Sequence, residues 1–176
     1  IKKLRMAIPV EVDLREYHKM IDEYLKSRES TEAEQLARLT KARHILATKK
    51  AINTIDFTKD LIEQNKKVVI VTCFTDVVKK IEKAFEGNVV KIVGGMSDIA
   101  KDNAKTEFQE GAAQVCVMNI IAGGVGITLT ASHNVIINDF DWTIGNIIQA
   151  EDRCARQGQT EITNVYYMYA EGADMD

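Results

Sequence analysis

The chain has 176 residues, of which 45% are hydrophobic and 28% are charged, and its formal net charge is −3. This length is that of one domain, which can bury a core without disulfides or metal, and the composition excludes a disordered chain, a collagen and a pure coiled coil. No apolar run approaches the roughly 20 residues of a membrane span, no signal peptide opens the sequence, and the slightly acidic balance gives no support for binding nucleic acid by charge alone.

The cysteines and histidines predict no metal site. Cys73, Cys116 and Cys154 lack CxxC spacing, and the first two lie in apolar runs that are typical of buried strands. We therefore expect free buried thiols in a reducing compartment. The three histidines are scattered along the chain without the spacing of metal ligands.

The first 64 residues predict a helical lead-in without glycine. The opening contains the only proline, Pro9, and is compatible with an extended strand or a linker. A helical stripe of apolar residues follows, and Thr31 with Glu34 has the pattern of a capping box at the start of a second helix. A third helix is expected over about residues 49–64. We interpret residues 1–64 as a connector or brace rather than a catalytic domain.

Beyond residue 65 the sequence alternates between strands and helices. Short β-branched runs predict strands over residues 68–71, 89–93, 115–118, 135–137 and 165–168. The segments between them have helical spacing and cap signals, among them a helix over about residues 144–157 that Gly158 ends. We therefore predict an α/β domain over residues 65–176, with a parallel sheet covered by helices on both faces. Ligands of such sheets bind at the carboxyl ends of the strands.

The segment QAEDRCARQGQ, residues 149–159, has the most informative pattern. On the expected helix, Gln149, Arg153 and Arg156 project from one face. Two neighbouring guanidinium groups repel each other unless an anion lies opposite them, and a triphosphate fits because its oxygens match the planar donors of arginine. The alternative is a solvated helix on which Asp152 pairs with Arg156, and two arginines taken alone favour that alternative.

Two loops between expected strands carry weaker patterns. The segment AGGVGITLT, residues 122–130, lets the backbone approach a ligand closely, but a tight loop required by packing also explains its glycines. It is neither a GxxxxGK(S/T) phosphate loop nor a GxGxxG motif. The segment DFDW, which begins at Asp139, follows a strand directly. Either a site or an ordinary capping turn accounts for it.

The combination of these segments is far more specific than any one of them. In the order strand, GGVG, strand, DFDW and QAEDRCARQGQ, they resemble motifs V and VI of superfamily 2 helicases. More narrowly, they resemble the Swi/Snf-type DNA translocases, whose motif VI reads QAxDRxxRxGQ. Upstream, KVVIVTCFT at residues 67–75 resembles motif IV, and Gly94, Lys101 and Phe108 match the spacing of the family's G…R…F segment. The resemblance covers about residues 67–176 and, more loosely, the lead-in.

The chain also departs from the family pattern. Asn119-Ile120 replaces Ser-Thr before the glycines, and Thr128 stands where Asn is commoner. Lys101 replaces Arg, and Thr143-Ile144 replaces Asn-Pro after the tryptophan. The first two departures, together with QAEDR, resemble most the branch of fork-remodelling, strand-annealing translocases.

This resemblance implies the second of two RecA-like lobes, with ATP in the cleft between them. It implies arginine fingers at Arg153 and Arg156, which stabilise charge on the transferring γ-phosphate. The ATP-binding residues that it implies are Gln149, Gly124, Gly126 and Asp139. The residues expected at the DNA backbone are Thr72, Gly94, Gly95 and Asn119, because small polar groups make such contacts without strong positive charge. The implied partners are DNA, double-stranded or forked and bound without sequence specificity, and the N-terminal lobe of the same parent protein.

The sequence holds no GxxxxGK(S/T) loop and no acidic pair of the kind that holds magnesium. We therefore expect ATP with Mg to bind mainly to a lobe outside this chain. Because the chain begins with Ile1 rather than Met, we expect a fragment. Because it lacks the phosphate loop and the metal-binding acids, we expect this fragment to be inactive alone. The expected location is intracellular: cytoplasmic for the prokaryotic or phage source that we favour, and nuclear for a eukaryotic one.

Two alternative functions remain. One is a self-sufficient nucleotide-binding α/β enzyme, and the other is a non-catalytic protein-binding module derived from a helicase lobe. The intact Arg153 and Arg156 argue against the second.

Overall fold

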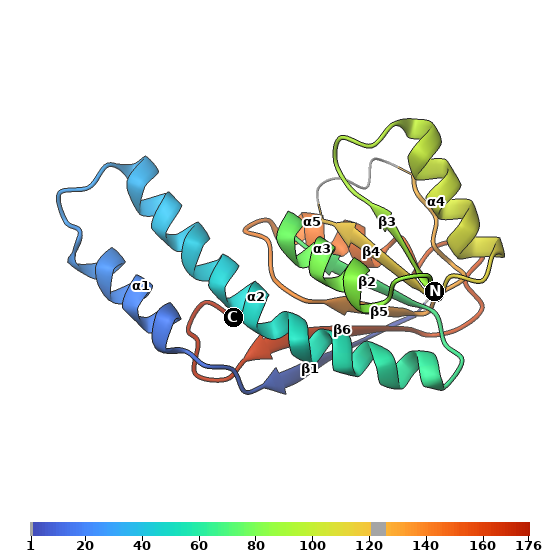
Figure 1. The fold of residues 1–176 in the computed structure, drawn as a ribbon, viewed down its shortest axis with the longest axis horizontal. Helices are drawn as coiled ribbons and strands as arrows, with labels where there is room; N and C mark the ends of the chain where they lie inside the picture. Colours follow the sequence, from blue (N-terminus) through green and yellow to red (C-terminus); the bar gives the residue numbers. More distant parts are fainter. Residues whose placement is uncertain (1, 121–125) are drawn as a thin grey trace.

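The computed structural model describes residues 2–120 and 126–176, which form an α/β fold (Figure 1). In chain order the elements are β1 (Lys3–Val10), α1 (Arg15–Lys26), α2 (Glu32–Glu63), β2 (Val68–Thr72), α3 (Thr75–Ala84), β3 (Val89–Ile92), α4 (Asp98–Glu110), β4 (Val115–Asn119), β5 (Asn134–Ile137), α5 (Ile144–Glu151) and β6 (Thr163–Ala170).

The described strands form one six-stranded parallel sheet in the order β1-β6-β5-β2-β4-β3. Every residue of β2 and β5 is buried, as expected for β-branched strands at the centre of a sheet with both faces covered. The predicted RecA-like parallel sheet is confirmed.

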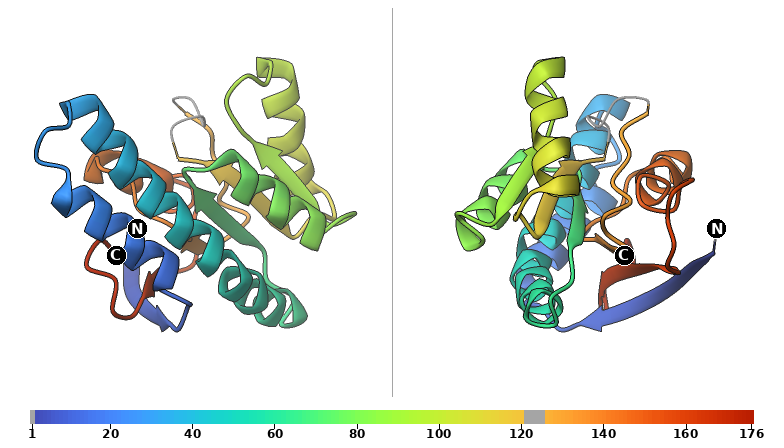
Figure 2. Two further views of the ribbon diagram at one scale, coloured as in Figure 1. Left: turned by 60° about the vertical axis from the view of Figure 1, so that its left-hand side comes forward. Right: turned by 90° about the vertical axis from the view of Figure 1, so that its right-hand side faces the viewer.

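The core consists of two layers, one on each face of the sheet. Successive residues of a strand point to opposite faces, so Ile70 of β2 packs with Ile81 of α3 and with residues of α2. Its neighbour Val71 packs in a second cluster that includes Phe108 of α4 and Ile147 of α5. In the right-hand view of Figure 2, α5 lies on the opposite side of the sheet from α2 and α3. The prediction of helices on both faces is confirmed.

The lead-in agrees with the sequence expectation in one respect and differs in another. Of the two forms expected for the opening segment, a strand or a linker, the structure has the strand: β1 pairs with β6 in parallel register from Lys3–Thr163 to Val10–Ala170. The expectation of separate second and third helices is wrong, since α2 is one helix of 32 residues. Its capping box begins at Thr31 as predicted, and no glycine or proline follows within the helix to interrupt it.

The lead-in both joins the sheet and extends beyond it. Ala47 and Ala51 of α2 belong to the sheet core, whereas Tyr17 of α1 packs with Ala42 and Leu46 of α2 in a separate small cluster. Figure 1 shows α1 and the first half of α2 extending away from the sheet as a helical hairpin. The division of the chain at residue 64 stays a prediction. Within the described ranges, no helix has the length and apolarity that crossing a membrane requires.

Candidate functional site

The carboxyl ends of β2 and β5 meet in a buried polar cluster. The hydroxyl of Thr72 donates to Oδ1 of Asp139 at 2.6 Å, and the backbone N–H of Cys73 donates to Oδ2 at 2.8 Å. The side-chain amide of Asn138 donates to the same carboxylate at 2.8 Å and accepts from Thr54 of α2 at 2.6 Å. Asp139 is 3% exposed, and the side chains around it are also buried. The cluster therefore fixes the ends of two neighbouring strands and ties them to α2.

This cluster gives Thr72 and Asp139 a structural role that their sequence context did not indicate. Thr72 is completely buried with its hydroxyl engaged, and Asp139 is not among the described residues that line the arginine cavity introduced below. Asn119, at the end of β4, donates its side-chain N–H to the carbonyl of Cys73 at 3.2 Å. The assignments of Thr72 and Asn119 to DNA and of Asp139 to ATP stay predictions.

A second group of expected site residues lines a cavity of about 160 Å³, here called the arginine cavity. The described residues of its walls are Gly126, Gln149, Asp152, Arg153 and Arg156. Both arginines lie in turns after α5, so the helix expected over residues 144–157 is wrong beyond Glu151. The turns nevertheless keep Gln149 and the two arginines around one cavity, as the sequence pattern predicted.

Hydrogen bonds hold the segment after α5 in its turns. The carbonyl of Arg153 accepts from the backbone N–H of Leu129 at 2.8 Å, which directs it away from a continuing helix. The side-chain amide of Gln159 donates to the carbonyls of Thr130, Ser132 and Cys154 at 3.2, 2.8 and 3.1 Å. Gln159, matched in the sequence as part of the motif, therefore fastens the segment to the connection between β4 and β5.

Within the part of the chain that the structure describes, Arg153 is a buried cation without an anionic partner. The residue is 7% exposed, and its Nε has no hydrogen-bond partner. Burial and, to a smaller extent, the positive charge of Arg156 lower the pKa of Arg153, partly offset by Asp152. Arg156 makes one long contact, 3.5 Å from Nη1 to Oγ1 of Thr128. Asp152 pairs with Lys3 of β1 rather than with Arg156, which contradicts the solvated-helix alternative.

Sequence reasoning missed the group that anchors the end of α5. The carboxylate of Glu151 is fully buried, and Arg5 binds it with two nitrogens at 3.0 and 2.7 Å. Lys3 adds a contact at 3.0 Å, and the hydroxyl of Tyr167 donates to Oε1. Burial alone would raise the pKa of Glu151, but the hydrogen bonds from Arg5, Tyr167 and Lys3 outweigh burial and lower it. No local pattern could reveal this group, because its partners lie at opposite ends of the chain.

Two of the expected glycines have backbone conformations that favour glycine. Gly126 has φ +97° and Gly95, in the turn after β3, has φ +82°, while a Cβ at either would meet no atom within 4 Å. The backbone, rather than lack of space, therefore disfavours a side chain there. Gly94 is exposed in the same turn as Gly95. Gly124, expected at the ATP site, lies outside the described residues.

The arginine cavity fits a phosphate group by its set of donors. Its two guanidinium groups and the amide of Gln149 offer planar N–H donors. A buried cation without a partner costs free energy, which an adjacent anion would recover. Across residues 2–120 and 126–176, no three His, Cys, Asp or Glu side chains are placed to hold a metal ion.

Comparison with known proteins gives a consistent set of matches. The family of helicase conserved C-terminal domains matches residues 48–158. The human protein named DNA annealing helicase and endonuclease ZRANB3 is 34% identical over 84 residues, which are 47% of this chain and 8% of that protein. A Xenopus tropicalis protein, SWI/SNF-related matrix-associated actin-dependent regulator of chromatin subfamily A-like protein 1, is 29% identical over 135 residues, 74% of this chain and 14% of that protein. The chain thus spans only a small part of these relatives.

Solved structures agree in fold. The SWI2/SNF2 ATPase core of Sulfolobus solfataricus in complex with dsDNA matches with a TM-score of 0.80 and 23% identity, over 97% of this chain and 41% of that chain. At this identity the likeness establishes the fold of the lobe.

Proposed function

The chain belongs to the family of helicase conserved C-terminal domains, in which it is a RecA-like lobe of Swi/Snf type. From this membership we propose that the chain works as the second motor lobe of an ATP-dependent translocase on double-stranded DNA. The observation that carries the proposal is the arginine cavity, where Arg153 and Arg156 have no described anionic partner. A γ-phosphate bound opposite them would supply that partner.

In the proposed mechanism, Arg153 and Arg156 act as arginine fingers. When a phosphoryl group transfers, its oxygens carry the charge, and fixed guanidinium donors stabilise that charge more in the transition state than in the ground state. Gln149 borders the same cavity and orients the arginines. Gly126, at the wall of the cavity, has a positive φ that residues with a side chain rarely adopt. Nucleotide with Mg is held mainly by a lobe with a phosphate loop, which this sequence lacks.

The proposed DNA surface is the edge of the sheet where β2, β3 and β4 end. It includes the exposed turn of Gly94 and Gly95 and the side chain of Asn119. Small polar groups and backbone N–H groups suit the phosphate backbone, which carries no sequence information. Thr72 contributes through its bond to Asp139, which keeps this edge in shape and couples it to β5.

The partners that we propose are non-sequence-specific DNA and the N-terminal lobe of the same parent protein. The solved relative in complex with dsDNA supports the double-stranded form. Names of relatives that refer to DNA annealing and to chromatin support an intracellular location. The preference for a prokaryotic or phage source stays a prediction.

ATP turnover by the isolated chain and by its full-length parent tests the proposal. We expect DNA-stimulated turnover from the parent and only background from the chain, because phosphate loop, metal and arginines must act together. Robust turnover by the purified chain, free of contaminating ATPase, would favour a self-sufficient enzyme and overturn the assignment as a second lobe. Absence of turnover from the parent would favour the non-catalytic module.

A further inference from the structure

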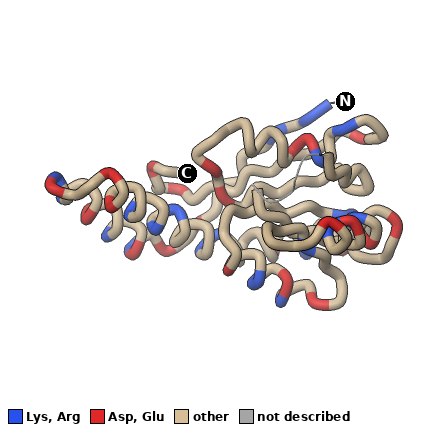
Figure 3. The backbone as a smooth tube through the Cα atoms, turned by 90° about the horizontal axis from the view of Figure 1, so that it is seen from above, with Lys and Arg blue, Asp and Glu red and all other residues tan. Residues whose placement is uncertain are grey.

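The start of β1 brings a positively charged side chain to the end of α5. Lys3 and Arg5 make the beginning of the chain basic, which Figure 3 shows as blue tube beside the N mark. The ammonium group of Lys3 donates to Oε2 of Glu151 at 3.0 Å and also forms an ion pair with Asp152. One lysine therefore binds two successive carboxylates, the second of which lines the arginine cavity.

The bond to Glu151 fixes the place of the ammonium group of Lys3. The carboxylate of Glu151 is fully buried, and the side chain of Lys3 is only 18% exposed. Arg5 and Tyr167 donate to the same carboxylate and hold it from other directions. Because an ammonium group carries three donors, Lys3 can bind Glu151 and Asp152 together. An exposed ion pair usually contributes little, since its side chains lose freedom when they meet, but this lysine is already held where it meets Asp152.

Asp152 has a choice between Lys3 and the two arginines of the cavity. Its side chain is 45% exposed and lines the same cavity as Arg153 and Arg156. Burial lowers the pKa of Arg153, and the negative charge of Asp152 partly offsets this effect. The spacing in the sequence alone favours a pair between Asp152 and Arg156. In the structure the ion pair of Asp152 is with Lys3, and among the described residues neither arginine of the cavity forms one.

We propose that Lys3 is a positioning residue for ATP hydrolysis, which holds Asp152 and thereby keeps Arg153 and Arg156 free for the phosphate. This inference rests on the proposed function of the two arginines as fingers. Without Lys3, Asp152 is released and forms a charge-assisted hydrogen bond with a guanidinium group of the cavity. That bond has to break before the arginine can stabilise the transferring phosphoryl group, so turnover falls. Lys3 acts in this way although it is not one of the described residues that line the cavity.

DNA-stimulated ATP turnover of the full-length parent, measured across ATP concentrations, tests the role of Lys3. We expect Lys3→Met to lower kcat about tenfold and to change KM for ATP by less than about threefold, because the arginines act mainly in the transition state. Lys3→Arg keeps a cation with donors for both carboxylates and should stay within about threefold of the unchanged parent. Adding Asp152→Asn to Lys3→Met should restore most of the lost turnover, because asparagine cannot form the competing ion pair.

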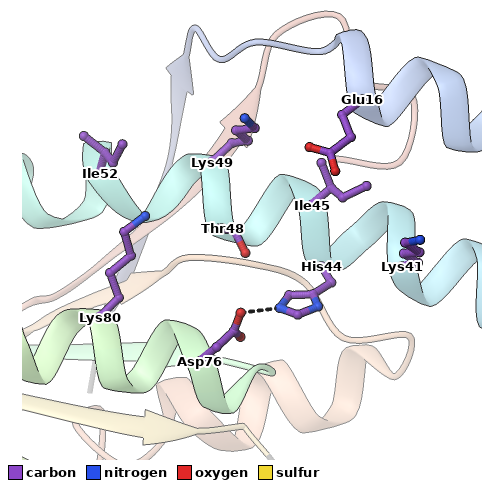
Figure 4. A pocket seen from close by; sticks show the side chains of 9 residues that line it. All are labelled: Glu16, Lys41, His44, Ile45, Thr48, Lys49, Ile52, Asp76 and Lys80. Carbon is purple, nitrogen blue, oxygen red and sulfur yellow. Dashed lines mark hydrogen bonds and ion pairs between the residues drawn. The ribbon is translucent and has the colours of Figure 1, made fainter.

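Two matched controls separate this role from a general effect of charge. Lys2→Met changes the adjacent exposed lysine, which forms no ion pair with the described residues. Asp76→Asn changes a carboxylate of similar exposure, 55%, which pairs with His44 in the cavity between α2 and α3 (Figure 4). Each control alone should change turnover by less than about twofold, and Asp76→Asn should not restore turnover to Lys3→Met, because distant sites act independently. Thermal melts followed by circular dichroism confirm that each variant folds.

Two results would overturn the positioning role of Lys3 and leave the motor proposal intact, provided that Arg156→Lys still abolishes most turnover. The first is equal turnover by Lys3→Met and Lys2→Met. The second is a loss in Lys3→Met that Asp152→Asn does not restore, because Lys3 would then act only through its bond to Glu151. Normal turnover by Arg156→Lys would instead remove the arginine fingers themselves and overturn both proposals.

Discussion

Arg156→Lys in the full-length parent protein tests the arginine cavity most sharply. Lysine keeps the positive charge but cannot offer the planar, two-pronged donors that fit a transferring phosphoryl group. Loss of an arginine finger costs on the order of 10³-fold in turnover, which is about 4 kcal/mol of transition-state stabilisation. We expect a loss of this size in DNA-stimulated ATP hydrolysis. Binding of nucleotide and DNA should weaken far less, because the contact acts mainly in the transition state.

The structure predicts that the same change barely affects folding. Arg156 is only half-buried, and its described side-chain contact is the 3.5 Å approach to Thr128, longer than an ordinary N–H···O bond. The repulsion between the cations at positions 153 and 156 persists with lysine. We therefore expect the free energy of unfolding of the 176-residue chain to change by less than about 0.5 kcal/mol.

Arg15→Lys is the matched control, because the side chain of Arg15 is 90% exposed and pairs with Asp13 far from the cavity. ATP turnover with and without duplex DNA, and the melting temperature, are measured on both variants. If Arg156→Lys hydrolyses ATP within about twofold of Arg15→Lys, the guanidinium has no special role and the assignment of the motif fails. A large loss of melting temperature would instead show that Arg156 is a structural residue.

Three further changes separate structural from functional roles. Glu151→Gln should destabilise the chain by about 2 kcal/mol, because it weakens the charge-assisted bonds that the buried carboxylate receives from Lys3, Tyr167 and the half-exposed Arg5, whereas Glu82→Gln, in a partly exposed pair, should cost less than about 1 kcal/mol. Folding lowers the pKa of Glu151, so its carboxylate stabilises the folded chain above the unfolded pKa of 4.5. This stabilisation is lost as the pH falls through the lower pKa of the folded state. In urea titrations across acid pH, the free energy of unfolding should therefore fall less steeply with decreasing pH in the glutamine variant than in the unchanged chain. Thr72→Val should cost about 1–3 kcal/mol, because it removes one of the three donors to the buried carboxylate of Asp139. Thr72→Ser should restore much of this stability. Equal stability of the unchanged chain and both variants would leave Thr72 only its proposed DNA role. Gly126→Val should reduce the DNA-stimulated ATPase of the parent protein more than Gly87→Val does. Gly87 is the matched control, because both glycines have a positive φ and open space around them. Equal losses of ATPase in the two variants would show that Gly126 is required only for folding.

The sheet and its two layers could be predicted because their signals are local. β-branched runs such as residues 68–71 identify a strand by themselves, and the alternation with helices then restricts the sheet to a parallel one. The prediction for α2 was wrong: a separate third helix was expected over about residues 49–64, although no glycine or proline divides it from the helix before it. The end of α5 was missed because the bond that ends it comes from Leu129.

Buried polar groups were the least predictable feature. Lys50 lies on a highly charged helix, yet it is fully buried between the carbonyl of Met168 and the carboxylate of Asp176. Burial lowers the pKa of Lys50, although Asp176 partly compensates. Similarly, Thr72 and Asp139 meet only because β2 pairs with β5. Which polar side chains are buried together depends on strand order, and strand order is not written in any single segment.

The charges of the arginine cavity depend on the lead-in, which the sequence suggested was only a brace. Two carboxylates, Glu151 and Asp152, directly precede Arg153 and would be its nearest counter-ions. In the structure both are occupied from β1, Glu151 by Arg5 and Lys3 and Asp152 by Lys3. Asp152 also lines the cavity and acts on Arg153 through its charge, but its ion pair is with Lys3, so among the described residues neither arginine of the cavity forms an ion pair. An edge strand from the start of the chain thus leaves the arginines available to an anion from outside, which is what transfer of a phosphoryl group at this lobe would require.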